Sequence, residues 1–379
     1  MSTTLTSLLP DAFAALDVVS RELIGFIPAM QRDMSADRAA LNQTIRSFVA
    51  PANTTANITP AMTPPTPAGQ TIGNRTLSIT KSKFAAFEWS GEDQRSADTG
   101  PGYLSVQQDQ IAQAIRVLIN EVEADAAALH IYASRAYGTS GTTPFAADLS
   151  DTAQLRKILD DNGAPPSDRH MIIDTSAGAK MRTLAQLTKA NESADVSMLR
   201  QGLLLNLHNF DIRESAQVAN FTKGTGAAYT TSAAGFAVGA TTIAIITGTG
   251  TVLAGDVLAV AGDTNKYLVT TGAAAPGNIV IAAPGLRVAI PAAATAVTIG
   301  ANSVRSMAFS RNAMALATRL PALPKDGDLA TDRTVLTDPR SGLSFELAYY
   351  PGFRMGGYFI GLAWGVANMK PEHSAILLG

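Results

Sequence analysis

The side chains able to carry catalysis are dispersed through this sequence. Its four histidines stand far apart and none lies in a metal-binding spacing such as HExxH: His130, His170, His208 and His373. Each is better explained as a packing or surface histidine than as a ligand. The chain has no cysteine, which excludes disulfides, thiolate metal sites and cysteine nucleophiles. We therefore expect no catalytic residue, no cofactor site and no metal site, and a protein that is not an enzyme.

The glycine-rich stretch 248–255 is the second chemical candidate. It resembles a phosphate-binding loop in composition, but it lacks the GxGxxG spacing and the Lys-Ser/Thr of a Walker loop. No helical pattern follows it. A turn between two strands explains this stretch better.

Charge is scarce along the whole chain. Charged residues make up 16% of its 379 residues, and the formal net charge is −2, whereas about a quarter is usual. A weakly charged surface resists self-association poorly, which favours a protein that assembles. There is no basic cluster to indicate nucleic-acid recognition, and the absence of cysteine fits a reducing cytoplasm.

Neither a signal peptide nor a membrane span is predicted. The N-terminus lacks a positive region, and Asp17, Arg21 and Glu22 interrupt its apolar stretch. The uncharged run 224–255 is long enough to cross a membrane, but it is rich in Gly and Thr and broken by turn signals. We expect a soluble protein with no membrane partner.

Among the elements that must position these residues, a compact all-β module between residues 224 and 303 is the most distinctive. This segment has only four charged side chains, Asp256, Asp263, Lys266 and Arg287. Short β-branched runs alternate with turn signals, at 243–246, 257–260, 267–269, 279–281 and 297–299. Such a charge-poor module, inserted between segments of ordinary charge content, suggests a protein that makes contacts with many neighbouring molecules.

Long arms and one long helix precede the module. Residues 11–26 form a predicted amphipathic helix that Pro28 ends, and the Pro- and Thr-rich stretch 50–73 predicts an extended arm before a strand at 76–80. The clearest element is a helix over 103–137, about 50 Å long, that stops at Gly138. It should act as a spine across a domain, whereas the arms need a partner to bury their apolar side.

The remaining segments alternate helix and strand and then become all strand. Two helices are predicted, one capped by Asp151 or Thr152 and ending at Asp161, the other capped by Ser176 and running through Leu187. A third helix is expected over 312–319, closed by Pro321. The predicted strands lie at 170–173, 210–215, 306–310, 333–336, 343–350 and 354–362.

This order of elements resembles the major capsid (coat) protein of tailed bacteriophages, the Hong Kong 97-type fold. It is similar in particular to the P-twenty-two-type branch, whose coat proteins carry an inserted β-barrel domain. The residues that carry the resemblance are LDVVSRELIGFIP at 16–28, ASRAY at 133–137, FSRNAMALATR at 309–319 and LAWGVANMKPE at 362–372. The resemblance spans nearly the whole chain and is weakest in 224–303, where only position and composition match.

The resemblance implies an α+β fold whose parts can be assigned by residue range. They are an N-terminal arm and helix at 1–49, an extended hairpin loop at 50–100, the spine helix of a peripheral domain at 101–138, an axial α/β domain at 139–218 and 304–330, the inserted β-barrel at 219–303, and C-terminal peripheral strands at 331–379. The extended loop would lie over a neighbouring subunit, and the barrel would bridge capsomers.

The resemblance also implies partners and a location. Copies of the chain would form pentamers and hexamers of an icosahedral shell around double-stranded DNA, without sequence-specific binding. A separate scaffolding protein and a portal protein would take part in assembly, and a decoration protein is left open. The shell would assemble in the bacterial host cytoplasm and end as the virion capsid.

Some viral shells of this kind join a lysine and an asparagine by an isopeptide bond, and Lys81 or Lys83 with Asn368 are the corresponding candidates. That reaction needs an acid in an apolar pocket, which the sequence does not locate. Solvated lysines are the simpler interpretation.

Three other classes of protein remain as alternatives. An encapsulin-like nanocompartment shell shares the fold and differs in cargo. An enzyme with an appended β-domain should show a polar catalytic cluster, and a secreted adhesin should carry a signal peptide. The sequence shows neither of these two features.

Overall fold

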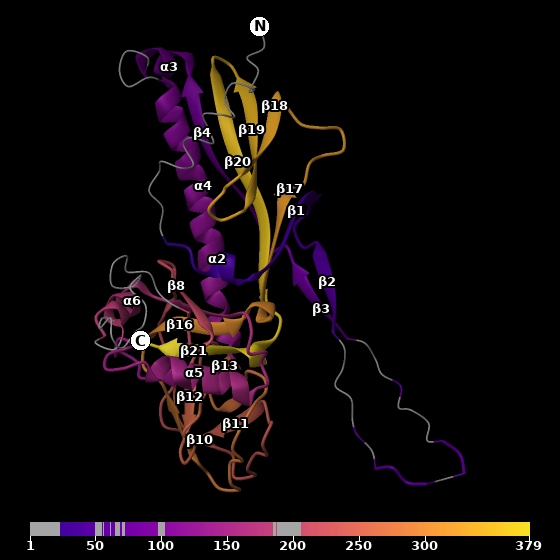
Figure 1. The fold of residues 1–379 in the computed structure, drawn as a ribbon, viewed down its shortest axis with the longest axis vertical. Coiled ribbons are helices and arrows are strands. Elements are labelled where there is room, and N and C mark those ends of the chain that lie inside the picture. The colour runs from indigo at the N-terminus through magenta and orange to yellow at the C-terminus, as the bar shows by residue number, and fades with distance from the viewer. Residues whose placement is uncertain are drawn as a thin grey trace.

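The computed structural model describes residues 23–49, 55, 57–60, 62–64, 69, 73–97, 103–184, 187 and 206–379. The predicted helix over 11–26 lies almost entirely outside these residues. Of its residues, 23–25 are described and are not helical, and Phe26 begins the short helix α2 (Phe26–Ala29). Figure 1 shows an elongated molecule, with a sheet and a long helix at one end and a small β-structure at the other.

The long helix α4 spans Tyr103–Ala128 and continues as a 3-10 turn, Leu129–Tyr132. At 1.5 Å per residue its 26 residues extend about 39 Å. The prediction was therefore right for the first three quarters and wrong for the end, since Arg135–Gly138 is strand β5. This segment pairs with two other strands, and that pairing outweighs the helical pattern of its sequence.

A six-stranded sheet packs one of its faces against α4. Its longest strand, β20 (Met355–Asn368), pairs with β4 (Lys81–Ser90) along one edge. Along the other edge it pairs with β19 (Ser344–Gly352) and then with β17 (Met314–Pro321). The outer strands are β18 (Asp332–Thr337) and β1 (Gln31–Ala39), the latter parallel to β17. The core between helix and sheet contains Ile111, Ile115, Leu118, Ile360, Leu362 and Trp364.

Strand β17 replaces the helix predicted over 312–319. Its alanines, leucine and methionine have good helix propensity, but the segment lies between β1 and β20 and is bonded to both. Only Arg311–Ala313 forms a 3-10 turn. The position of β17 also moves it out of the predicted axial range 304–330 and into the sheet of the C-terminal strands.

A second sheet forms the middle of the molecule. Its strands follow the order β5, β21 (Ser374–Leu378), β16 (Ser303–Ser310), β6 (Arg169–Ile173), β8 (Phe210–Glu214) and β7 (Asn206–Leu207). Helices α5 (Ser150–Asp161) and α6 (Thr175–Arg182) pack on it around a core that includes Leu155, Leu159 and Met181. Asp174, rather than the predicted Ser176, caps α6, since its carboxylate accepts from two backbone N–H groups. β21 lies here although residues 331–379 were assigned to the peripheral strands.

The charge-poor segment forms a closed barrel, which we call the β-module. Its six strands pair in the order β12, β15, β10, β11, β14, β13 and back to β12. Their bounds are β10 Tyr229–Thr231, β11 Thr242–Ile246, β12 Val257–Val260, β13 Lys266–Thr271, β14 Gly277–Ile281 and β15 Ala296–Ile299. The five predicted strands are all present. Strand β13 also pairs with β5, so the barrel is joined to the second sheet by backbone hydrogen bonds.

A two-stranded hairpin leaves the body of the molecule. It pairs β2 (Thr44–Val49) with β3 (Gly73–Ser78) and carries the loop 50–72. Figure 1 shows this hairpin and the described residues of its loop projecting to one side, away from the sheets. The arm is thus shorter than the predicted range 50–100, because β4 and helix α3 (Gly91–Ala97) lie on the body.

Candidate functional site

The predicted cross-linking lysines are held by the spine helix. Lys81 Nζ lies 2.8 Å from Asp125 Oδ1 and 3.0 Å from Glu121 Oε1, and Lys83 Nζ lies 2.5 Å from the same Glu121 oxygen. Partial burial lowers the pKa of Lys81, but its hydrogen bonds to Asp125 and Glu121 outweigh burial and raise the pKa overall. Lys81 is therefore kept as an ammonium ion, which is not a nucleophile.

Asn368 does not approach either lysine within the subunit. The pairing of β4 with β20 places Lys81 opposite Trp364, and Asn368 lies opposite Met314 on β17. The Asn368 amide donates to Ser374 Oγ at 3.0 Å, and its buried Oδ1 has no hydrogen-bond partner among the described residues.

The four histidines also lie apart in the structure. His130 is buried and its Nδ1 lies 3.1 Å from the Ala127 carbonyl, while His208 Nδ1 lies 2.6 Å from Thr152 Oγ1. His170 lies between Asp168 and Asp211. Within the described part of the chain, no group of three or more His, Cys, Asp or Glu side chains is placed to hold a metal ion. No described helix combines the length and apolar character needed to span a membrane.

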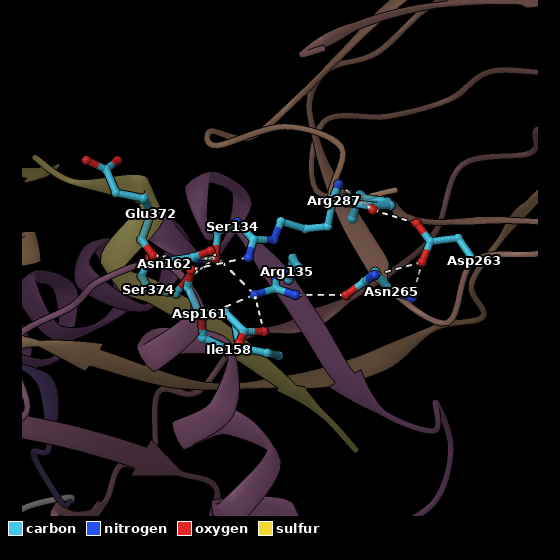
Figure 2. A network of polar contacts seen from close by, with 11 residues as sticks. Ser134, Arg135, Ile158, Asp161, Asn162, Asp263, Asn265, Arg287, Glu372 and Ser374 are labelled. Atoms are coloured by element: carbon cyan, nitrogen blue, oxygen red, sulfur yellow. Dashed lines mark hydrogen bonds and ion pairs between the residues drawn. The ribbon is translucent and has the colours of Figure 1, made fainter. Parts of the chain in front are cut away.

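A polar network joins the β-module to the second sheet, and Figure 2 shows it. Arg135 of β5 is 4% exposed and lies at its centre. Its guanidinium donates to Asn265 Oδ1 of the β-module at 2.8 Å and, on the other side, to the Ile158 carbonyl at 3.2 Å and Asp161 Oδ2 at 3.3 Å. Burial lowers the pKa of Arg135, and the hydrogen bond with Asp161 opposes that effect. The arginine thus holds the end of α5 and the barrel together.

Further contacts support this junction from the barrel side. Lys266 Nζ donates to the Gly138 carbonyl at 2.5 Å, and Arg287 donates to the Asp161 carbonyl at 3.3 Å. Asp263 accepts hydrogen bonds from Asn265 and, at 2.6 Å, from the Tyr267 hydroxyl. Burial, together with this bond to Asp263, raises the pKa of Tyr267 to about 12. Three of the four charged residues of the β-module therefore belong to its junction with the second sheet.

The fourth, Asp256, is fully buried where the chain enters the barrel. Its carboxylate accepts from the backbone N–H of Gly224 at 3.0 Å and of Leu253 at 2.7 Å. The nearby Arg305 is 1% exposed and stacks on Phe221, with 4.8 Å between its guanidinium carbon and the ring centre. Burial lowers the pKa of Arg305 to about 10, and the charge of Asp256 acts in the opposite direction.

A second carboxylate, Glu123, fastens the N-terminal segment to the spine helix. It is fully buried on α4 and accepts hydrogen bonds from the backbone N–H groups of Gly25, Phe26 and Ile27 and from Ser215 Oγ. Glu123 is not among the residues predicted from the sequence to have a role. A signal was available, because Glu123 follows Val122 and lies four residues after Ile119 on the apolar stripe of the helix.

The arm and the sheet present exposed apolar surface. Ile58 and Met62 of the arm are completely exposed. On the six-stranded sheet a groove of about 560 Å³ is lined by Phe84, Phe359, Pro321 and Leu323 together with charged side chains. Phe84 is 65% exposed. The described residues thus provide exposed apolar surfaces for contact with other molecules.

Comparison with known proteins identifies the fold. No protein-family model matches the chain, and no curated protein matches it. Solved structures do match. A chain of "Mycobacterium phage Che8" superposes with a TM-score of 0.50 and 13% identity, covering 95% of this chain and 92% of the other. A chain of "Capsid structure of the Cyanophage P-SCSP1u" gives a TM-score of 0.53 with 10% identity and coverage of 95% and 89%.

A third match is a chain of "Asymmetric unit of bacteriophage PhiM1 mature capsid", with a TM-score of 0.50, 10% identity and coverage of 95% and 88%. All three likenesses extend over nearly the whole of both chains. The protein therefore has a mixed α/β fold that is found in phage capsids.

Proposed function

We propose that this chain is the major capsid protein of a tailed bacteriophage, with a Hong Kong 97-type fold and an inserted β-barrel. Copies form pentamers and hexamers that close into an icosahedral shell around double-stranded DNA. The observation that carries the proposal is the likeness to chains of phage capsids over 95% of the sequence.

The arm supports the same conclusion independently. Its loop exposes Ile58 and Met62 completely, and it projects from a body that already has its own core (Figure 1). Exposed apolar side chains on a projecting segment are stabilised when a partner buries them, by about 1.5–3 kcal/mol for each side chain. A neighbouring copy in a shell is such a partner.

The parts of the chain have separate roles in this proposal. The six-stranded sheet with α4 is the peripheral domain, the second sheet with α5 and α6 is the axial domain around the symmetry axes, and the hairpin β2–β3 lies over a neighbour. The scarcity of charge suits large contacts between copies. A scaffolding protein and a portal protein are the expected assembly partners, and the virion is the expected location.

Electron microscopy of negatively stained protein tests this function. The chain is produced alone and together with a scaffolding protein encoded beside it. Closed shells, or rings of the size of capsomers, are the expected products. A monodisperse monomer under every assembly condition would overturn the proposal.

A further inference from the structure

The charged residues of the β-module are confined to the side that faces the second sheet. Asp263 and Arg287 belong to the junction in Figure 2, Lys266 donates to the Gly138 carbonyl of β5, and Asp256 is fully buried. All residues from 224 to 303 are described, so this placement covers the whole module. The rest of its surface has no charged side chain.

The strands farthest from the junction are β10 and β11. The junction involves β12 and β13, and in the closed order of the barrel β10 and β11 lie opposite these two strands. Side chains alternate along β11, so that Ile243 and Ile245 are buried and Thr242, Ala244 and Ile246 face outward. Ile246 is 39% exposed and lies opposite Thr230 of β10. We call this surface, formed by Thr230, Thr242, Ala244 and Ile246, the outer barrel face.

The loop of the arm, like the outer barrel face, carries no charged side chain. From Ser47 to Asn74 no residue is charged, and Ile58 and Met62 are completely exposed. Figure 1 shows the described residues of the arm at the level of β10 and β11 along the long axis of the molecule, but well to one side of them. The described residues of the arm therefore do not cover the outer barrel face of their own subunit, which leaves that face accessible to the arm of a second copy.

We propose that residues 57–60 and 62–64 of one copy bind the outer barrel face of a second copy, with Ile58 and Met62 packed against Ile246. This proposal rests on the proposed shell function and names a partner for the arm within it. Two surfaces without charges can bury their apolar side chains on each other without desolvating an ion.

The groove on the six-stranded sheet is the competing site for the arm. Its lining includes Lys83, Asp328, Arg333 and Glu346. These side chains form ion pairs within the subunit, and an uncharged segment bound over the pairs would remove them from water and add no new charged partner. The outer barrel face has no such cost. The charge pattern therefore favours the barrel over the groove.

Photo-cross-linking in assembled particles tests the contact. Ile58 is replaced by p-benzoylphenylalanine, and copies with this residue are assembled with isotopically labelled copies that lack it. After irradiation, mass spectrometry should find labelled peptides from residues 229–247 joined to position 58. The same replacement at Val117, which is 58% exposed on α4, should not yield these peptides.

Other outcomes overturn the inference. Cross-links to the groove segments 82–84 or 321–324, cross-links within one subunit, or an unreacted arm would each do so while leaving the shell function intact. Failure to form any shell or ring would instead remove the proposed function, and this inference with it.

A charge introduced on the outer barrel face gives a second test. Ile246→Lys should lower the yield of the cross-link from position 58 at least tenfold, and Val335→Lys, on a residue that is 43% exposed on β18, should not. The free subunits of both variants should melt as the wild type does, because both side chains are exposed. Equal cross-link yields in the two variants would contradict the contact.

Discussion

Glu123 and Gly25 are 98 positions apart in the chain, yet the carboxylate of one accepts a hydrogen bond of 2.5 Å from the backbone N–H of the other. The same carboxylate also binds the N–H groups of Phe26 and Ile27. A single buried side chain of the spine helix thus satisfies the free donors at the start of α2. It thereby connects the N-terminal segment to the core of the six-stranded sheet.

Glu123→Ala should lower the free energy of unfolding by about 3 kcal/mol, because three buried N–H groups and a hydroxyl lose their acceptor. Glu123→Gln should lose less, since an amide oxygen can still accept. Chemical denaturation of the unassembled subunit measures both. The control is Asp109→Ala, on an exposed residue of the same helix, which should change stability by less than about 0.5 kcal/mol. A decrease in unfolding free energy for Glu123→Ala as small as that of the control would show that the hydrogen bonds of Glu123 do not stabilise the subunit.

Arg135→Ala should loosen the β-module from the second sheet. The substitution removes the donor for Asn265, Asp161 and the Ile158 carbonyl, so we expect a loss of about 2 kcal/mol and faster amide hydrogen exchange at the β5–β13 pairing. Arg135→Lys should not restore the contacts, because an ammonium cannot span both sides. Arg287→Ala serves as the control, since it breaks only the single 3.3 Å contact with Asp161 that reaches out of the barrel. Unchanged exchange in Arg135→Ala would refute the junction's role.

His130 should make the subunit less stable in acid. Burial lowers its pKa from 6.5 to about 4, and the neighbouring Arg305 acts in the same direction. The unfolded chain therefore takes up this proton near pH 6.5, whereas the folded chain does so only near pH 4. The stabilisation is present above pH 6.5 and is lost as the pH falls toward 4, by about 3 kcal/mol.

His130→Gln removes this titration. The difference in unfolding free energy between wild type and variant should shrink toward low pH, and denaturation curves at pH 7, 5.5 and 4.5 measure it. Parallel pH profiles for the two proteins would show that His130 does not titrate in this way.

Particles boiled in detergent should give a single band near the subunit mass of 39.4 kDa. Lys81 is held as an ammonium by Asp125 and Glu121, and Lys83 also binds Glu121, so neither amine is free to attack Asn368. A ladder of covalent multimers that Lys81→Arg or Lys83→Arg abolishes would show that the cross-link forms between subunits.

The local sequence pattern correctly predicted those helices and strands whose tertiary contacts agree with the secondary-structure preferences of their own residues. The strands of the β-module were predicted from β-branched runs between turn residues. Alternate residues are buried in β11, and consecutive residues are buried in β12 and β13. Helix α5 was placed with its end at Asp161. The first 26 residues of the predicted spine helix were correct for the same reason, since their apolar spacing matches the face that packs on the sheet.

The wrong secondary-structure predictions concern segments whose strand pairing with distant residues opposes the helix preference of their own sequence. Residues 314–321 have the composition of a helix, but they complete hydrogen bonds with β1 and β20 on both sides. Residues 135–138 were assigned to the helix before them, and they bridge β13 and β21 instead. The position of Glu123 on the apolar stripe of the helix indicated burial, but the partners of Glu123 and of Arg135 could not be assigned from the sequence, because they are distant in the chain.

The sequence by itself determined that the chain carries little charge and that a charge-poor β-module interrupts its second half. These properties depend on which residues are present and on their local spacing. Only the tertiary structure decided that the module is a closed barrel fused to β5, that its charges gather at one side, and that the hairpin projects from the body. Each of these depends on hydrogen bonds and burial between segments far apart in sequence, which local preferences do not specify.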